Sequence, residues 1–136
     1  MCIVLADNQA DVRSALRLLL THVLALHVVG EVTAAADLWT QVQDARPDLL
    51  LLDWGLLGAG AGAALARLHA LYPALQVIVL SGHPEARQHA LAAGADAFVS
   101  KADSPEQMLK TLRAARARGS AGRATDDGAM TEGTDE

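Results

Sequence analysis

Cysteine and aromatic side chains are scarce in this chain, and both shortages restrict what it can be. Cys2 is the single cysteine, so the chain can form neither an intramolecular disulfide nor a cysteine-based metal cage. This cysteine usage fits a cytoplasmic protein. Aromatic residues make up 3% of the 136 residues, so a core has to be built from Leu, Val, Ile and Ala. Such residues suit parallel strands covered by helices and favour an α/β fold over a β-sandwich.

An excess of basic charge and long apolar runs are also lacking. The formal net charge is -5, and most of it lies in residues 119–136, where Arg123 is outnumbered by Asp126, Asp127, Glu132, Asp135 and Glu136. The rest of the chain is close to neutral and offers no electrostatic footprint for nucleic acid or an anionic membrane. No apolar run reaches the roughly 18 residues of a membrane span, and no basic leader precedes the first expected strand. We therefore expect no direct nucleic-acid binding, no membrane association and a cytoplasmic location.

Short apolar runs alternate with helical patterns five times along the chain. This alternation is typical of strand and helix units in a parallel sheet. The expected strands are 2–6, 26–32, 49–52, 76–80 and 97–100, and the expected helices are about 9–21, 33–45, 63–71, 85–93 and 105–117. Capping signals stand at three helix ends: Thr33 as an N-cap, Gly94 as a C-terminal cap, and Ser104 as an N-cap before Pro105.

Five such units in this order predict one α/β domain with a doubly wound, five-stranded parallel sheet and helices on both faces. Strand order 2-1-3-4-5, the flavodoxin-like arrangement, is the common solution at this length. We assign residues 1–118 to this domain. Residues 119–136 are rich in Gly, Ser, Thr and acids without an apolar period, so we expect a disordered acidic tail there.

Four polar residues stand at the ends of four expected strands. Asp7 follows the first strand and Asp53 ends the third, while Ser81 and Lys101 follow the fourth and fifth. In open parallel sheets the ligand site lies beyond the carboxyl ends of the strands, so these side chains should share one rim. Asp7 and Asp53 taken alone are equally well explained as cap or loop residues, and Ser81 and Lys101 taken alone are better explained as a turn residue and a surface residue. The hypothesis of a site depends on their joint placement.

That placement predicts a chemistry. Two facing carboxylates repel each other, and a hard cation such as Mg2+ with oxygen ligands relieves the repulsion. Asp53 would then act as a nucleophile toward a phosphoryl donor and form an acyl phosphate. The ammonium of Lys101 and the hydroxyl of Ser81 would offset the charge on the phosphoryl oxygens.

Three stretches of the chain resemble the receiver domains of response regulators in two-component systems. They are residues 3–7 (IVLAD), 47–53 (PDLLLLD) and 94–101 (GADAFVSK), and the resemblance covers roughly residues 2–117. It implies that Asp53 is the phosphoacceptor, that Asp7 helps to hold Mg2+ and that Gly55 offers its backbone carbonyl to the metal. It further implies that Lys101 contacts the phosphoryl group, that Ser81 is the switch hydroxyl, and that Phe98 is the aromatic side chain that changes rotamer with it.

The resemblance also implies partners and an output. A sensor histidine kinase or a phosphotransfer protein would supply the phosphoryl group, and a downstream protein effector would read a changed interaction face. That face would be the surface of the fourth helix, the fifth strand and the fifth helix, through which a homodimer is also expected. The cations of the last helix are either part of that docking edge or a solvated face: Lys110, Arg113, Arg116 and Arg118. Such a protein is a phosphoacceptor and not an enzyme, with at most Mg2+-dependent self-phosphorylation and self-dephosphorylation.

The chain departs from the receiver pattern in the loops around the expected site. Asn8 stands where receivers carry a second acid, and Leu57 stands where a proline is usual. An Asn oxygen can still ligate Mg2+, but the site has one negative charge fewer. The alternative function is therefore a degenerate receiver-like module that binds a protein partner without being phosphorylated.

Three other kinds of site fit the sequence less well. A flavin-binding module needs phosphate-cradling donors after the first strand, where residues 7–11 are DNQAD. A hydrolase of the Asp-x-Asp kind needs an acid where Gly55 stands. The five histidines fall on different expected elements without ligand spacing: His22, His27, His69, His83 and His89. His83 is set apart as a candidate gate to Asp53, because it stands in the loop beside Ser81.

Overall fold

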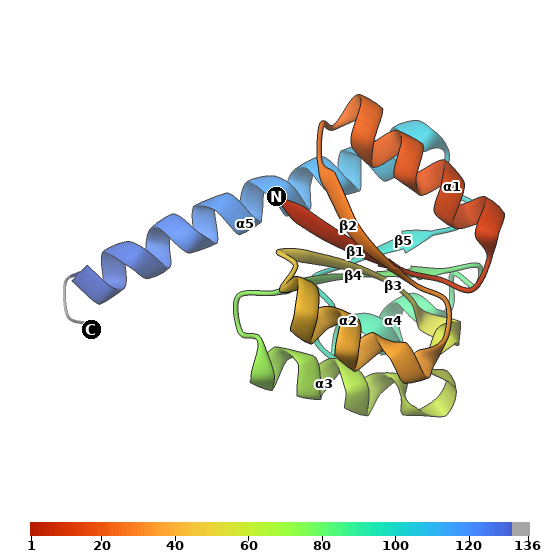
Figure 1. The fold of residues 1–136 in the computed structure, drawn as a ribbon, viewed down its shortest axis with the longest axis horizontal. Coiled ribbons are helices and arrows are strands. Elements are labelled where there is room, and N and C mark those ends of the chain that lie inside the picture. The colour runs from red at the N-terminus through yellow and green to blue at the C-terminus, as the bar shows by residue number, and fades with distance from the viewer. Residues whose placement is uncertain (132–136) are drawn as a thin grey trace.

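Five parallel strands form one sheet in the order β2-β1-β3-β4-β5 (Figure 1). The strands are β1 (Cys2–Ala6), β2 (His27–Val32), β3 (Leu49–Asp53), β4 (Gln76–Ser81) and β5 (Ala97–Ser100). This computed structural model describes the backbone of residues 1–131 and the side chains of residues 1–118. The predicted fold class, the strand order and the parallel pairing are all confirmed.

The central strand β3 supplies side chains to both faces of the sheet. It pairs with β1 on one side and β4 on the other, and all five of its residues are buried. Leu50 and Leu52 join one hydrophobic cluster, whereas Leu49 and Leu51 join a second. Because neighbouring side chains on a strand point to opposite faces, a run of four leucines fits a strand covered on both sides.

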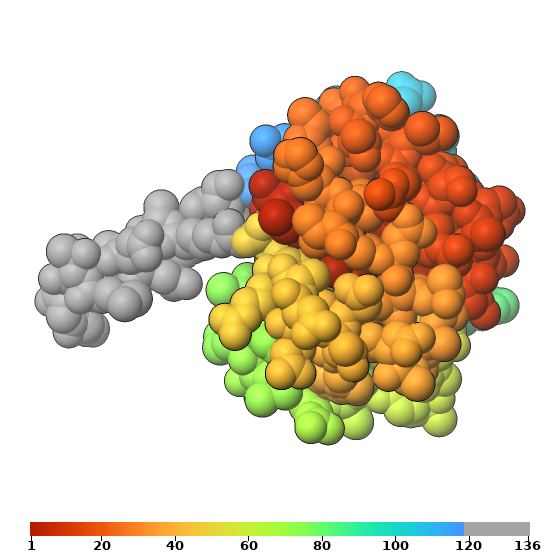
Figure 2. Space-filling view, in the orientation of Figure 1, coloured from red at the N-terminus to blue at the C-terminus, as the bar shows by residue number. Residues whose placement is uncertain are grey.

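Two layers of helices cover the sheet (Figure 1). On one face, α1 (Ala10–Leu18) and α5 (Pro105–Thr131) pack Leu16 and Leu112 into the same cluster as Leu51. On the other face, α2 (Leu38–Ala45), α3 (Ala61–Leu71) and α4 (Ala86–Ala92) cover the cluster that contains Leu50. Figure 2 shows the segments of α1, β2 and α2 side by side on one surface of this body.

The helix ends test the predicted capping signals. Gly94 has φ +110 just after α4, a left-handed conformation that favours glycine, so this cap is confirmed. The Ser104 hydroxyl accepts a hydrogen bond from the Gln107 backbone N–H at 3.2 Å, which confirms the N-cap of α5. The Thr33 cap was wrong. The chain stays extended to Ala34 and then forms a 3-10 turn over Ala35–Asp37 before α2 begins.

Besides α2, two helical segments run past their expected ends. A π-helical turn over Leu19–Val23 continues α1, and α5 runs to Thr131 instead of ending near Ala117. Alanine and arginine, which fill residues 114–118, are strong helix formers and give α5 no reason to stop there. The predicted tail starts inside α5, whose backbone is described to Thr131. The side chains of 119–136 and the backbone of 132–136 lie outside the described residues, and the disorder of that part stays a prediction. None of the helices within residues 1–131 is long and apolar enough to cross a membrane.

Candidate functional site

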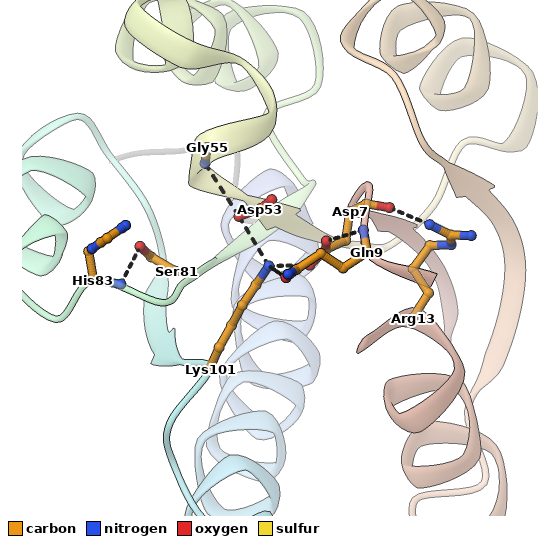
Figure 3. A network of polar contacts seen from close by, with 8 residues as sticks. All are labelled: Asp7, Gln9, Arg13, Asp53, Gly55, Ser81, His83 and Lys101. Carbon is orange, nitrogen blue, oxygen red and sulfur yellow. Dashed lines mark hydrogen bonds and ion pairs between the residues drawn. The ribbon is translucent and has the colours of Figure 1, made fainter. Parts of the chain in front are cut away.

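Residues far apart in the sequence meet at the carboxyl edge of the sheet. Asp7 directly follows β1, Asp53 is the last residue of β3, and Lys101 directly follows β5. The Lys101 Nζ lies 2.7 Å from Asp7 Oδ2 and 3.4 Å from Asp53 Oδ1. Figure 3 shows the lysine side chain reaching across the strand ends to both carboxylates. The structure therefore brings together three of the four residues singled out from the strand ends.

The charged side chains at this edge are largely buried, which strengthens the interactions between them. The side chains of Asp7, Asp53 and Lys101 are 1%, 12% and 16% exposed. In such surroundings the two carboxylates repel strongly, and the ammonium between them offsets that repulsion. The three groups together carry one net negative charge, which favours a cation at the site.

The loop that carries Asp7 is held by several hydrogen bonds. The Asp7 N–H donates to the Val32 carbonyl at 2.9 Å, and Asp7 Oδ1 accepts from the Gln9 backbone N–H at 2.9 Å. The Asp7 carbonyl accepts from Arg13 Nη1 at 2.7 Å, while Arg13 Nε pairs with Glu31 on β2 at 2.9 Å. These contacts fix where the carboxylate points.

One oxygen of Asp7 is left for an ion. Asp7 Oδ2 is buried and has no hydrogen-bond partner among the described residues, although Lys101 Nζ lies 2.7 Å away. The contact with Lys101 is a charge–charge contact between the ammonium and the carboxylate. A buried carboxylate oxygen without a hydrogen bond is costly, and a bound cation would remove that cost.

Asp53 is oriented by the turn that follows it. Its Oδ1 accepts from the Gly55 backbone N–H at 3.3 Å, and the 3-10 turn Trp54–Leu56 starts there. Within the described part of the chain, Asp53 Oδ2 makes no hydrogen bond or ion pair. Because the side chain is also 12% exposed, this oxygen is open to a reactant from solvent.

Ser81 lies at the same edge without touching the charged groups. It is 5% exposed, and its Oγ accepts from the His83 backbone N–H at 3.0 Å (Figure 3). Its carbonyl accepts from the Lys101 N–H at 2.8 Å, which ties the ends of β4 and β5 together. The imidazole of His83 is 81% exposed and lies 3.6 Å from Glu85, so it does not cover Asp53.

Phe98 and Asn8 lie outside this group of contacts. Phe98 on β5 is 8% exposed and packs into the cluster covered by α2, α3 and α4. It also lines a groove of about 520 Å³ between α4 and α5, together with Arg87 and Lys110. Asn8 is exposed and follows Asp7 directly.

The oxygens at the edge fit a hard divalent cation. Within the described residues no group of three or more His, Cys, Asp or Glu side chains is placed to hold a metal. The oxygens that the structure places together at this edge are those of the Asp7 and Asp53 carboxylates. Oxygen donors with two carboxylates are what Mg2+ requires, and the buried Asp7 Oδ2 is ready for one bond.

Two residues at the site were missed by sequence reasoning. Gln9 Oε1 accepts from Lys101 Nζ at 2.7 Å, and Arg13 holds the Asp7 carbonyl. Gln9 stands only two residues after Asp7, which is the one signal that pointed to it. In the sequence Arg13 reads as an ordinary exposed position on an amphipathic helix, and only the folded structure places its guanidinium at the loop.

Comparison with known proteins gives a match to a family model, relatives in sequence and solved structures of similar fold. The model described as "Response regulator receiver domain" matches residues 3–113. The chain is 31% identical over 114 residues to the uncharacterized transcriptional regulatory protein YhcZ of Bacillus subtilis (strain 168), covering 82% of this chain and 53% of that protein. It is 33% identical over 115 residues to the transcriptional activator protein ExaE of Pseudomonas putida, covering 83% and 54%. The chain thus spans about half the length of the curated relatives it matches.

Solved structures share the fold. A response regulator receiver domain protein (CheY-like) from Methanospirillum hungatei JF-1 superposes with a TM-score of 0.76 at 20% identity, covering 89% of this chain and 97% of that one. The isolated REC domain of RcsB from Salmonella enterica serovar Typhimurium, solved in the presence of phosphomimetic BeF3-, has a TM-score of 0.75 at 22% identity, covering 85% and 88%. At these identities the likeness extends to the fold alone.

Proposed function

Because this chain belongs to the response regulator receiver domain family of two-component signalling, we propose that Asp53 is the residue that accepts the phosphoryl group. A two-component receiver has a histidine kinase as its partner and is a phosphoacceptor, not an enzyme in the usual sense. The observation that carries the proposal is the Lys101 ammonium within 3.4 Å of both Asp7 and Asp53. This arrangement leaves Asp53 Oδ2 open to a donor.

The proposed reaction is a phosphoryl transfer between two side chains. An Asp53 carboxylate oxygen attacks the phosphorus of a phosphohistidine on the sensor kinase or on a phosphotransfer protein. The new O–P bond makes an acyl phosphate, the P–N bond breaks, and the histidine nitrogen keeps the electron pair. Lys101 stabilises the negative charge on the phosphoryl oxygens, because its ammonium already lies beside the acceptor.

The family typically binds Mg2+, and four residues would hold it here: Asp7, Asp53, Asn8 and, through its carbonyl, Gly55. When bound, the ion neutralises charge on the phosphoryl oxygens and on the two carboxylates. Self-phosphorylation from small acyl phosphates and self-dephosphorylation belong to the same proposal. Both reactions need Asp53 to be reachable from solvent, as its exposed oxygen allows.

The output would be a change in a protein-binding surface. In the structure Ser81 Oγ accepts from the His83 N–H, so its own O–H remains to donate to a phosphoryl oxygen on Asp53. Movement of Ser81 would vacate space for Phe98, which lines the groove between α4 and α5. A downstream effector, or a second copy of the chain, would bind the α4–β5–α5 surface. The proposed location is the cytoplasm, where a sensor histidine kinase would phosphorylate the chain.

One substitution favours a second function. With Asn8 in place of an acid, the site has less negative charge for Mg2+ and for a transfer that depends on it. The second candidate is a module that binds its protein partner without phosphorylation. The two candidates differ in a single measurable property, the formation of an acyl phosphate.

The test is incubation of the chain with acetyl phosphate, with and without Mg2+, followed by intact mass spectrometry. The proposal predicts a mass increase of one phosphoryl group that needs Mg2+ and is absent in Asp53→Asn. An Asn8→Asp variant should be phosphorylated faster, because it adds a charge next to Asp7. Gln43→Glu on the exposed side of α2 makes the same change in net charge and should not alter the rate. No adduct in the wild type together with an adduct in Asn8→Asp would favour the second candidate.

A further inference from the structure

The ammonium of Lys101 is surrounded by three oxygens from three parts of the chain. Two belong to the carboxylates of Asp7 and Asp53, and the third is Gln9 Oε1. The contact with Gln9 Oε1 is a hydrogen bond, whereas the contacts with the two carboxylates are charge–charge contacts. Figure 3 shows the Gln9 side chain turned toward the lysine beside Asp7.

The distances show where the ammonium sits. It lies 2.7 Å from Asp7 Oδ2 and 2.7 Å from Gln9 Oε1, but 3.4 Å from Asp53 Oδ1. The Lys101 ammonium is therefore closer to Asp7 and Gln9 than to Asp53, the proposed phosphoacceptor. To reach an oxygen of a phosphoryl group on Asp53, it has to give up part of its present coordination.

The backbone of Gln9 is fixed on both sides. Its N–H donates to Asp7 Oδ1 at 2.9 Å, and its carbonyl accepts from the Arg13 N–H at 3.0 Å as α1 begins. The side chain is on an exposed residue, yet it turns inward to the lysine. Because its starting point is held, little additional freedom is lost when the side chain binds Lys101.

We propose that Gln9 is a positioning residue that holds Lys101 beside Asp7 in the resting state and is replaced by a phosphoryl oxygen when Asp53 is modified. This inference rests on the proposed function of Asp53. Gln9 supplies the only neutral oxygen of the three, so its bond to the ammonium is the cheapest to exchange for a bond to a charged oxygen. Lys101 also lines a cavity of about 240 Å³ between α1 and α5, with Leu80 and Met108, which leaves space for its side chain to move.

We call the contact by which Gln9 keeps Lys101 beside Asp7 the resting hold, and its loss on modification of Asp53 the release. The resting hold can be tested without phosphorylation. The chain has two lysines, Lys101 and the exposed Lys110, so Lys110 is an internal reference for amine reactivity. The measurement is reductive methylation with formaldehyde and borane in buffer without divalent cations, read by peptide mass spectrometry as the ratio of Lys101 to Lys110 modification. Gln9→Ala should raise this ratio about three- to tenfold, as expected for a partly exposed hydrogen bond to a charged group.

Two further variants separate positioning from general damage. Gln9→Glu keeps an oxygen at the same reach and should leave Lys101 as protected as in the wild type. Gln43→Ala removes an exposed glutamine on α2 and should leave the ratio unchanged. Melting temperatures of all variants show whether they are folded. An unchanged ratio in a folded Gln9→Ala, or a ratio in Gln9→Glu as high as in Gln9→Ala, overturns the resting hold.

The release is tested by repeating the methylation with Mg2+ and beryllofluoride, a phosphoryl mimic. If a phosphoryl oxygen takes the place of Gln9, Lys101 is protected equally in the wild type and in Gln9→Ala. A difference between them that persists while the mimic is bound overturns the release. Failure of the wild type to bind the mimic overturns the release and the proposed function together, whereas the resting hold is decided by the first experiment alone.

Discussion

Lys101 determines the charge balance at the carboxyl edge of the sheet. Its ammonium is paired with Asp7 Oδ2 and Asp53 Oδ1, and the three side chains are all at most 16% exposed. Without it, two largely buried carboxylates would face each other with no positive charge between them. The lysine therefore has a structural role in the resting protein in addition to its proposed role in phosphoryl transfer.

This dual role predicts a coupling between Lys101 and Asp53 in stability. Lys101→Met should lower the free energy of unfolding by about 1–3 kcal/mol, less than for a fully buried pair because the lysine is partly exposed. Asp53→Asn should recover part of that loss in the Lys101→Met background, since it removes the unpaired charge. Urea denaturation of the two single variants and the double variant measures the coupling.

The matched control is Lys110→Met, which removes the other lysine from an exposed position on α5. Its effect should stay within about 0.5 kcal/mol. The interpretation fails if Lys101→Met is no more destabilising than Lys110→Met, or if Asp53→Asn has the same effect in both backgrounds.

The sequence was enough to place some of the site residues at this edge but not others. Asp7, Asp53 and Lys101 could be assigned to one edge because the end of a parallel strand fixes where the next side chain stands. Gln9 and Arg13 could not, because their contacts depend on the rotamers of long side chains. The exposure of the His83 imidazole and the hydrogen bond from the His83 N–H to Ser81 Oγ could not be predicted either.

At the scale of elements, the two edges of the sheet use aspartates differently. At the amino edge, Asp48 Oδ2 accepts from the Cys2 N–H at 2.8 Å at the start of β1, and Asp96 Oδ2 accepts from the Val77 N–H at 2.7 Å in β4. Each aspartate stands just before one strand and binds a backbone N–H of the neighbouring strand: Asp48 links the segment before β3 to β1, and Asp96 links the segment before β5 to β4. The acids of residues 47–53 and 94–101 are thus explained by strand pairing at one edge and by the candidate site at the other.

The start of α5 offers an element-scale prediction. Ser104→Ala removes the hydroxyl that accepts from the Gln107 N–H, and should lower the free energy of unfolding by about 1 kcal/mol. Ser14→Ala, on the exposed side of α1, makes the same chemical change without a cap and should be neutral or slightly stabilising. Equal effects in chemical denaturation would show that the Ser104 hydrogen bond does not contribute.

Element boundaries were predictable where local chemistry decides them. The cap at Ser104 and the turn at Gly94 depend on the residue's own hydroxyl or on its freedom at positive φ. The start of α2 was misplaced because a threonine after a strand resembles an N-cap, whereas the chain there inserts a 3-10 turn. The length of α5 was also missed, since no residue in an Ala- and Arg-rich stretch marks an end.

At the scale of the whole molecule, the sheet separates two hydrophobic cores. The one under α1 and α5 includes Leu51, which is fully buried, and the other includes its neighbours Leu50 and Leu52. Because β3 contributes to both cores and ends in Asp53, the packing of the centre also positions the candidate site. Low aromatic content is compatible with this arrangement, since leucines fill the centre of both layers.

Removal of one central leucine should therefore destabilise the molecule strongly. Leu51→Ala is expected to cost about 2–5 kcal/mol, because it leaves a cavity between β3 and the α1 and α5 layer. Leu18→Ala, at a position that is 60% exposed, should change stability by no more than about 0.5 kcal/mol. Comparable losses in thermal or urea denaturation would contradict the assignment of the core.

The central claim is that the Asp53 carboxylate becomes an acyl phosphate, and borohydride trapping tests it most directly. Borohydride reduces an aspartyl phosphate to homoserine, and peptide mass spectrometry then shows which residue was modified. After treatment of the wild-type chain with acetyl phosphate and Mg2+, the account predicts homoserine at position 53 and none in Asp53→Asn. Homoserine at another aspartate, or no homoserine in a sample whose intact mass shows a phosphoryl adduct, would contradict it.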